Sequence, residues 1–285
     1  MKQEISSNNE KLFKKVFEIL TKFKDNPKKF ENIFTELFEK DFETQLNEIS
    51  KLKSGLLKGL IISVKDLFDV RGYHTRGGTK FLETDVCLGD AKCISNIRKA
   101  GGLLLGHTNM TELAYSGLGI NTHYGTPINP LYPGSVPGGS TSGGAVSIAL
   151  DLSDIAVGTD TGGSTRIPAA FTGITGFKST QDSISRDGVL TLSSSLDSVG
   201  LMAKNVELCK LGYQAMRTKL NTKQVKLQNK NFKFIIPSNF GFENIDTEIK
   251  IAFDLAKKKI TENGYEMIEM NVPVLDLYKK VPIWQ

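Results

Sequence analysis

The sequence lacks several features that would place it in a special class of protein. Its 285 residues contain no apolar run of 18 or more, so no membrane-spanning helix is expected. The first twenty residues lack the uncharged apolar core of a secretory signal, and a cytoplasmic location is therefore expected. The three cysteines contain no Cys-x-x-Cys pair, and their odd number argues against a framework of disulfide bonds.

Motifs for metals and phosphates are missing as well. The spacing of His74, His107 and His123 does not match a metal site. No Gly-Lys dipeptide occurs, which excludes the phosphate-binding P-loop, and the dinucleotide fingerprint Gly-x-Gly-x-x-Gly is absent. Neither Ser140 nor Ser164 lies in Gly-x-Ser-x-Gly, the turn that carries the nucleophile of α/β-hydrolases.

The net charge of +5 does not indicate a nucleic-acid-binding surface near the glycine–serine loops of residues 138–144 and 162–164. Residues 54–203 carry 11 basic and 12 acidic side chains, whereas residues 204–285 carry 14 and 9. A protein that binds nucleic acid directly would be expected to carry its basic excess at the working site. Direct binding of nucleic acid or of a membrane is therefore not expected.

The apolar pattern predicts an α/β fold with a mixed, largely parallel central sheet covered by helices on both faces. Phenylalanine-rich helical patterns predict two amphipathic helices, over residues 11–24 and 29–53. Short apolar runs predict six strands, at residues 59–64, 103–105, 154–158, 174–177, 232–236 and 265–270. The expected helices alternate with them, at residues 90–100, from 108 onward, and at 142–150, 204–217 and 246–263.

The chain is expected to form one domain in three segments. A helical segment, 1–55, precedes a catalytic core, 56–217, and an α/β continuation, 218–285. A polar stretch near residues 218–231 is a soft boundary between the last two.

Two glycine–serine loops lie 24 residues apart, counted from Ser140 to Ser164. The first reads Gly-Gly-Ser-Thr-Ser-Gly-Gly over residues 138–144, and the second reads Gly-Gly-Ser over 162–164. Small residues beside a hydroxyl let the backbone approach a bound group closely. Because Ser164 lies on a tight turn after a predicted strand, neighbouring N–H groups are free to stabilise an oxyanion. This pattern favours hydrolysis with a serine nucleophile.

A serine nucleophile needs a base, and no histidine lies near either loop in the sequence. A histidine that the fold brings close stays open as the base. Lys65 is a further candidate because it ends a predicted apolar strand, where burial lowers the pKa of its amine. Lowering that pKa from about 10.4 to about 7–8 costs on the order of 3–4 kcal/mol.

These residues resemble the amidase signature family. The motifs are SVKD around Lys65, PGGSTSGG around Ser140 and GTDTGGSTRIPAA around Ser164. Their separations of 75 and 24 residues match the family's Ser–cisSer–Lys triad. The similarity covers residues 56–205 and includes GHTNMTELAYSGLG and SLDSVGLMAK.

The resemblance implies roles for these residues. Ser164 would attack an amide carbonyl, and Ser140, on a cis peptide bond with Gly139, would bridge it to the base Lys65. Water would then hydrolyse the acyl-enzyme, and no metal or cofactor is implied. The resemblance also implies an oxyanion hole built from the backbone N–H groups of Thr161, Gly162, Gly163 and Ser164.

Other polar residues near these motifs have supporting or structural interpretations. Asp160 and Arg166 are expected either to support the site as a polar network or to serve only the fold. His107 stands where relatives commonly carry lysine and is interpreted as structural, and Asp66 is expected to cap a turn. Thr141 replaces the second serine of the common Gly-Gly-Ser-Ser-Gly-Gly form and keeps a hydroxyl.

Two activities remain open from the resemblance. One is a stand-alone amidase acting on a small carboxamide, which residues 115–127 favour, with a homodimer left open. The other is the A subunit of a tRNA-dependent amidotransferase, a glutaminase that would need B- and C-type subunits. Family members run well past 285 residues, so the chain is expected to be either a fragment or a shortened member. A non-catalytic binding protein is the third alternative.

Overall fold

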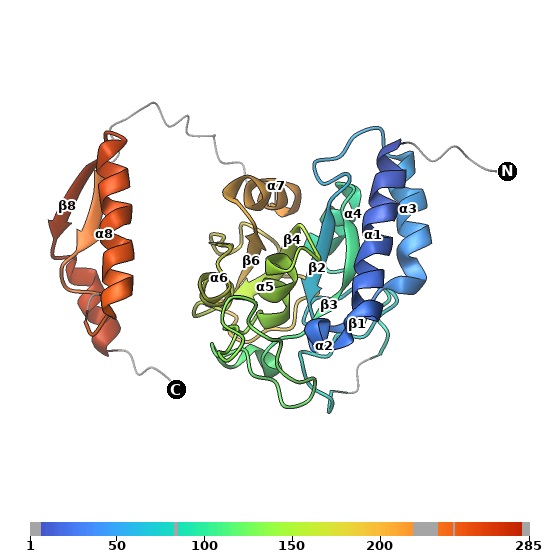
Figure 1. Cartoon of the computed structure of the whole chain (residues 1–285), viewed down its shortest axis with the longest axis horizontal. Coiled ribbons are helices and arrows are strands. Elements are labelled where there is room, and N and C mark those ends of the chain that lie inside the picture. The colour runs from blue at the N-terminus through green and yellow to red at the C-terminus, as the bar shows by residue number, and fades with distance from the viewer. Residues whose placement is uncertain (1–6, 83–84, 219–232, 242, 281–285) are drawn as a thin grey trace. The chain divides into compact units, whose positions relative to one another are not determined.

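Figure 1 shows the computed structural model of the chain, which divides into two compact units, Met1–Leu220 and Asn221–Gln285. The soft boundary expected near residues 218–231 lies almost entirely outside the described residues, and the prediction of a single domain stays a prediction. The structure describes residues 7–82, 85–218, 233–241 and 243–280.

The first unit is built on a six-stranded sheet in the order β1-β3-β2-β4-β6-β5. Strands β3, β2 and β4 in the centre are parallel, while β1, β6 and β5 pair antiparallel. The mixed α/β sheet expected from the sequence is thus confirmed. The strands are β1 (Phe34–Leu37), β2 (Ile61–Lys65), β3 (Leu103–Thr108), β4 (Ile155–Asp160), β5 (Thr175–Lys178) and β6 (Ser198–Ala203).

Helices cover both faces of this sheet. Alternate residues of β4 point to opposite faces. Ile155 lies against Gly212 of α7, whereas its neighbour Ala156 lies against Gly144 of α5. The helices of the first unit are α1 (Ser7–Asp25), α2 (Pro27–Phe30), α3 (Phe42–Lys51), α4 (Lys92–Lys99), α5 (Ser142–Ala149), α6 (Arg166–Phe171) and α7 (Val206–Met216). Two short 3₁₀ turns, η1 (Glu39–Asp41) and η2 (Glu112–Ala114), complete the unit.

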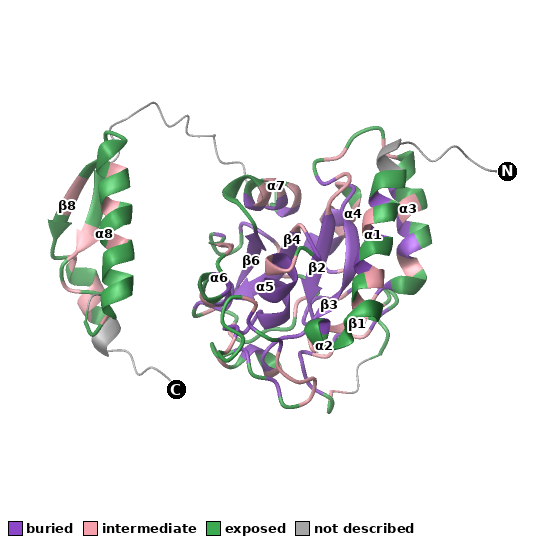
Figure 2. Cartoon of the chain, viewed as in Figure 1, coloured by how far each residue is buried: buried purple, intermediate pink, exposed green. Residues whose placement is uncertain are grey.

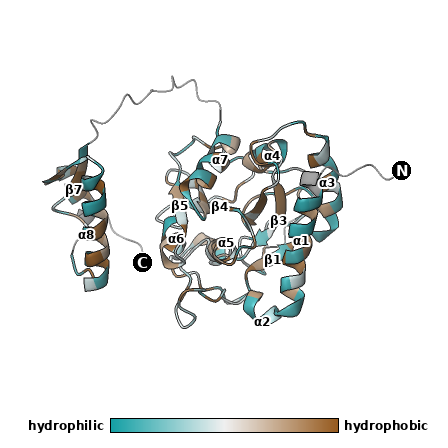
Figure 3. Cartoon of the chain, turned by 45° about the horizontal axis from the view of Figure 1, so that its top comes forward, coloured by the Kyte–Doolittle hydropathy of each residue, from teal (hydrophilic) through white to brown (hydrophobic). Residues whose placement is uncertain are grey.

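Burial is concentrated in the centre of the sheet. Every residue of β2, β3, β4 and β6 is buried, as the purple strands of Figure 2 show. Figure 3 shows the strand β3 in the brown of hydrophobic residues, between helices that carry teal hydrophilic positions. A polar side chain on such a strand loses contact with water, which is costly unless it finds hydrogen-bond partners.

The prediction of a single helix over residues 29–53 is wrong. It is divided into α2, the strand β1 and α3, with Asn32 in the left-handed region at φ 63°. The segment pairs instead with β3: the Asn109 N–H donates to the Ile33 carbonyl at 2.9 Å, and the Phe38 N–H donates to the Leu105 carbonyl at 3.0 Å. The apolar spacing fits a helix, but the open edge of β3 offers hydrogen bonds that the spacing does not reveal.

The prediction of a helix that begins at Thr108 is wrong as well. Thr108 ends β3, and only the turn η2 follows, with Leu113 and Ala114 at φ 49° and 62°. Distant segments take the N–H groups that a helix would use, since Leu113 donates to Gly77 and Thr111 donates to Ser140. The polar residues here tie loops together and do not cap a helix.

The strand β6 is not among the predicted strands, because its residues lie in SLDSVGLMAK, which the sequence identifies only as a family motif. The remaining strands and helices expected from the sequence agree with the structure to within a few residues.

The second unit contains two parallel strands and one long helix. These elements are β7 (Lys233–Pro237), α8 (Thr247–Glu262) and β8 (Glu266–Met270), followed by the 3₁₀ segment η3 (Pro273–Lys280). No residue of α8 is buried within the described part of the chain.

The cysteines are free thiols, with Cys93 and Cys209 buried and Cys87 partly exposed. Burial raises the pKa of the Cys93 thiol to about 12. No helix among the described residues is both long and apolar enough to cross a membrane.

Candidate active site

Lys65 is the last residue of β2, and its side chain is completely buried. The Nζ atom of Lys65 donates a hydrogen bond to the Ser140 Oγ at 2.8 Å. It donates a second one to the Thr159 Oγ1 at 3.0 Å, from the neighbouring strand β4. The amine is therefore held by two hydroxyls, one of which belongs to the first glycine–serine loop.

Burial lowers the pKa of the Lys65 amine to about 7, although the carboxylates of Asp160 and Asp197 act in the opposite direction. Removal from water penalises the ammonium form more than the two negative charges restore it. A substantial fraction of Lys65 is therefore neutral near pH 7, as a general base requires.

The first glycine–serine loop holds Ser140 from both sides. The Gly139–Ser140 peptide bond is cis. The Gly139 N–H donates to the Gly117 carbonyl at 2.8 Å, and the Ser140 carbonyl accepts the N–H of Thr111 at 3.0 Å. Ser140 is fully buried, so these contacts fix its Oγ relative to Lys65.

Gly139 is expected to accept a side chain only with a loss of stability. A Cβ atom at this position would lie 2.6 Å from the backbone nitrogen of Gly119, which cannot move without displacing the adjoining loop. We expect Gly139→Ala to lower the free energy of unfolding by about 1–3 kcal/mol, as overpacked sites do. Chemical denaturation measures this loss. The matched control is Gly134→Ala, since a Cβ at Gly134 meets no atom within 4 Å; equal stability of the two variants would contradict the prediction.

Ser164 lies on the turn between β4 and α6 and is 9% exposed. Its carbonyl accepts the Thr141 N–H at 3.1 Å, so the two glycine–serine loops are joined one residue beyond Ser140. No described residue hydrogen-bonds to the Ser164 Oγ. The structure thus links Lys65 directly to Ser140, and it links Ser164 to that loop through the backbone.

The turn that leads to Ser164 carries backbone N–H groups that are available to a ligand. Gly163 adopts φ +135°, and a Cβ there would come within 2.7 Å of the Ile167 side chain. Within the described residues, no acceptor is assigned to the backbone N–H groups of the four oxyanion-hole candidates, Thr161, Gly162, Gly163 and Ser164. Such groups are available to an oxygen that develops negative charge.

Asp160 and Arg166 form a bidentate ion pair behind this turn. The Arg166 Nε donates to the Asp160 Oδ2 at 3.0 Å, and its Nη2 donates to Oδ1 at 2.9 Å. The Oδ2 also accepts the N–H groups of Thr165 and Arg166, both at 3.3 Å. Burial alone would raise the pKa of the Asp160 carboxyl, but these hydrogen bonds and the guanidinium charge lower it. The carboxylate therefore holds the start of α6 against the end of β4.

Asp66 and His107 form a second buried group. The His107 Nε2 contacts the Phe68 carbonyl at 3.1 Å, and burial lowers the pKa of His107 to about 3. Burial raises the pKa of the Asp66 carboxyl to about 7, even though its Oδ1 accepts the N–H of Arg76 at 3.2 Å. Neither residue contacts the Lys65 amine through a hydrogen bond within the described residues.

The sequence did not identify two residues that interact with the Lys65 amine. Thr159 precedes the Asp160 of the second motif and binds the Lys65 amine. Asp197 lies in the SLDS stretch and contributes its charge to the surroundings of Lys65. Both lie inside stretches that resemble the family, but nothing in one sequence shows which of their polar residues point toward Lys65.

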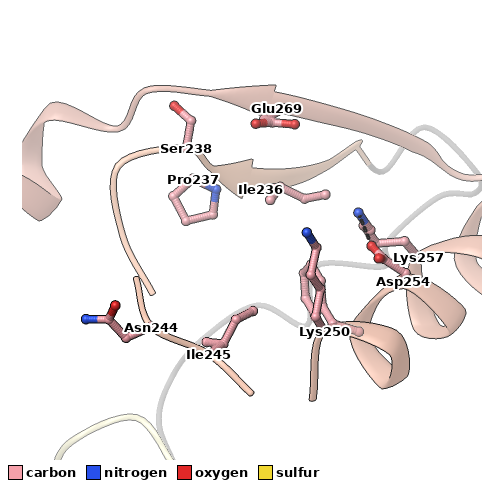
Figure 4. Close-up of a pocket in the computed structure, with 10 residues that line it drawn as sticks. Ile236, Pro237, Ser238, Asn244, Ile245, Lys250, Asp254, Lys257 and Glu269 are labelled. Carbon is pink, nitrogen blue, oxygen red and sulfur yellow. Dashed lines mark ion pairs between the residues drawn. The ribbon is translucent and has the colours of Figure 1, made fainter. Parts of the chain in front are cut away.

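A separate pocket lies within the second unit (Figure 4). It has a volume of about 540 Å³ and lies between β7, β8 and α8. Its lining includes Lys250, Lys257 and Glu269, and Lys257 pairs with Asp254. None of the residues assigned to the candidate site lines it.

Comparison with known proteins identifies the family. The family model described as Amidase matches residues 18–283. The chain belongs to the Amidase family. The glutamyl-tRNA(Gln) amidotransferase A subunit of Ralstonia nicotianae is 44% identical over 163 residues, which are 57% of this chain and 33% of that protein. The 2-amino-5-chloromuconic acid deaminase of Comamonas testosteroni is 32% identical over 223 residues, covering 77% of this chain and 48% of the relative.

The Amidase family fold is also found among solved structures. A crystal structure of an amidase superposes with a TM-score of 0.81 at 28% sequence identity. It covers 97% of this chain and 65% of the other chain. The chain thus spans one third to about half the length of the curated relatives described above.

Proposed function

We propose that this chain carries the catalytic residues of an amidase that hydrolyses a small carboxamide through an acyl-enzyme. The observation that supports this most directly is the buried Lys65 amine, 2.8 Å from the Ser140 Oγ. Ser140 lies one residue from the backbone hydrogen bond that joins its loop to Ser164. A base of lowered pKa, a hydroxyl relay and a second serine on a turn with free N–H groups are the parts that acyl transfer requires.

In the acylation step, the Ser164 Oγ forms a bond to the amide carbonyl carbon. Its proton passes to the Ser140 Oγ, which gives its own proton to the neutral Lys65 amine. The carbonyl oxygen becomes negative, and the N–H groups of residues 161–164 donate to it. Collapse of this intermediate breaks the carbon–nitrogen bond, and the leaving nitrogen takes the proton back from Lys65 through Ser140.

Deacylation uses the same relay in the same direction. A water molecule attacks the acyl carbon while its proton passes through Ser140 to Lys65. When the bond to the Ser164 Oγ breaks, that oxygen takes the proton back from Lys65 through Ser140, and the acid product leaves. Because Lys65 must start each half-reaction neutral, we expect kcat/KM to rise with pH through about 7, where the amine loses its proton.

A second candidate is the glutaminase component of a tRNA-dependent amidotransferase. The 44% identity with the A subunit from Ralstonia nicotianae favours it. The same acyl chemistry would then act on glutamine, and the ammonia would pass to a partner protein. The two candidates differ in substrate and in dependence on partners, whereas the roles of Lys65, Ser140 and Ser164 are shared.

The proposal is tested with the full chain and a fluorophosphonate probe, which phosphonylates activated serines. We expect a single adduct, mapped by peptide mass spectrometry to the peptide that contains Ser164. The chain is then incubated with small carboxamides and hydroxylamine. Hydroxylamine attacks an acyl-enzyme and releases the acyl group as a hydroxamate. Hydroxamates from a range of carboxamides support the stand-alone amidase, and a hydroxamate from glutamine alone supports the amidotransferase component. No adduct and no hydroxamate would overturn the catalytic proposal in favour of a binding protein.

A further inference from the structure

Asp197 is a buried carboxylate that the proposed mechanism does not use. It immediately precedes β6, the antiparallel neighbour of β4, and is 5% exposed. A carboxylate so far removed from water requires strong hydrogen-bond donors or a nearby positive charge. Its partners therefore indicate what it does.

The carboxylate connects two segments at the site. The Thr161 Oγ1 donates to its Oδ1 at 2.6 Å. The backbone N–H groups of Leu192 and Ser193 donate to its Oδ2 at 2.9 Å and 3.0 Å. Hydrogen bonds to an ionised acceptor are roughly twice as strong as neutral ones. Asp197 thus attaches the first residue of the oxyanion turn to the 192–193 segment.

Asp197 also acts on Lys65 from the neighbouring strand. Ser198, the residue after Asp197, pairs with Asp160 of β4. The β4 residue before Asp160 holds the Lys65 amine through its hydroxyl. Of the two carboxylates that oppose the effect of burial on Lys65, Asp160 has its own guanidinium partner, Arg166. Asp197 has no ion-pair partner among the described residues. Its negative charge is therefore compensated by neutral donors alone, and its field on the Lys65 amine is not cancelled by an adjacent cation.

We propose that Asp197 is a positioning residue of the reaction, which fixes the Thr161–Ser164 turn for the developing oxyanion and stabilises the Lys65 ammonium. This inference rests on the proposed function. One side chain thus both fixes the oxyanion turn and stabilises the ammonium. The ammonium forms when the Ser164 proton reaches Lys65, at the same moment as the oxyanion, so both charges of the intermediate depend on Asp197.

The test is Asp197→Asn, which keeps the shape of the side chain and removes its charge. Without this charge the Lys65 pKa falls, so the rise of kcat/KM with pH is expected to move downward by roughly 0.5–1 pH unit. We expect kcat to fall by about 10- to 100-fold with little change in KM, because the lost contacts act mainly on the transition state. A titration of the Lys65 ¹³Cε signal by NMR, assigned with Lys65→Met, measures the pKa independently of turnover.

Two further variants separate the effects. Thr161→Val removes only the hydroxyl that binds Asp197, and we expect it to lower kcat while leaving the Lys65 titration in place. The control for loss of a carboxylate elsewhere is Asp154→Asn, which lies at the opposite end of β2 from Lys65. Asp154 also accepts a backbone N–H, that of Ile61 at 2.7 Å, and it pairs with Lys15 at 2.7 Å. We expect Asp154→Asn to lower stability without shifting the pH profile.

An unchanged Lys65 titration in Asp197→Asn would overturn the electrostatic role, and an unchanged kcat in Thr161→Val would overturn the positioning role. If the wild-type chain forms no adduct and no hydroxamate, the proposed function fails. The NMR titration still tests the effect of Asp197 on Lys65 in that case. The two failures are thus distinguishable.

Discussion

Ser164→Ala is expected to abolish amide hydrolysis, with kcat lower by about 10⁴-fold or more. Removal of the Oγ leaves no atom to form the acyl-enzyme, so neither Lys65 nor Ser140 has a proton to accept. The fold should persist, because no described residue depends on the Ser164 Oγ for a hydrogen bond. The measurement combines steady-state kinetics with intact-protein mass spectrometry after exposure to the fluorophosphonate.

The control for this variant is Ser153→Ala. Ser153 is also a buried serine, but its Oγ belongs to a cluster with Ser63 and Ser147 at 3.0 Å and 2.8 Å. We expect Ser153→Ala to lose some stability and to retain its probe adduct and its activity. Equal labelling of wild type and Ser164→Ala would remove Ser164 as the nucleophile, and the serine that carries the adduct would take its place.

Lys65→Met should eliminate turnover almost as completely. Methionine fills a similar volume but cannot accept a proton, so general-base catalysis is lost. We expect kcat/KM to fall by about 10³-fold or more, near the upper range for this kind of catalysis. The probe adduct should form far more slowly than in wild type, because Ser164 is no longer activated. A variant that keeps more than a tenth of wild-type activity would contradict the assignment of Lys65 as the base.

The same substitution should change how stability depends on pH. The folded-state pKa of Lys65 is about 7, below the ordinary value of 10.5, so the unfolded chain binds more protons between these two values. Stability contributed by this position is therefore lowest below pH 7 and rises as the pH increases toward 10.5. Burial of the charged amine costs about 4–5 kcal/mol below pH 7, at roughly 1.4 kcal/mol for each unit of pKa shift.

Urea unfolding at several pH values measures this effect. Between pH 7.5 and 9.5, the free energy of unfolding of wild type should rise relative to that of Lys65→Met by about 2–3 kcal/mol. Taking the difference between the two proteins removes the contribution of groups that both contain. A difference that stays constant with pH would show that Lys65 titrates normally, and the mechanism would then lack its neutral base.

Much of the candidate site could be proposed from the sequence because its motifs are local in the chain. The glycines beside Ser140 and Ser164 and the apolar strand before Lys65 depend only on neighbours in the chain. Glycine is required wherever the backbone approaches another group too closely for a Cβ, and such positions form recognisable motifs. The α/β architecture follows in the same way from alternating apolar runs, which bury strands between helices.

Long-range partners could not be predicted in this way. The helix expected over residues 29–53 is interrupted by β1, because the edge of β3 provides hydrogen bonds to Ile33 and Phe38. Likewise, residues 108–112 form no helix, since Thr111 supports Ser140 instead. In each case the local pattern allows two conformations, and a contact with a distant segment selects one.

The sequence by itself determined the types of residue that carry the proposed chemistry, their order in the chain and the fold class. Only the tertiary structure decided which hydroxyls hold the Lys65 amine and how far burial lowers its pKa. It also decided that Asp197, in a motif with no assigned role, binds Thr161. The physical reason is that pKa values and charge–charge contacts depend on distance and exclusion of water, which chain neighbours alone do not set.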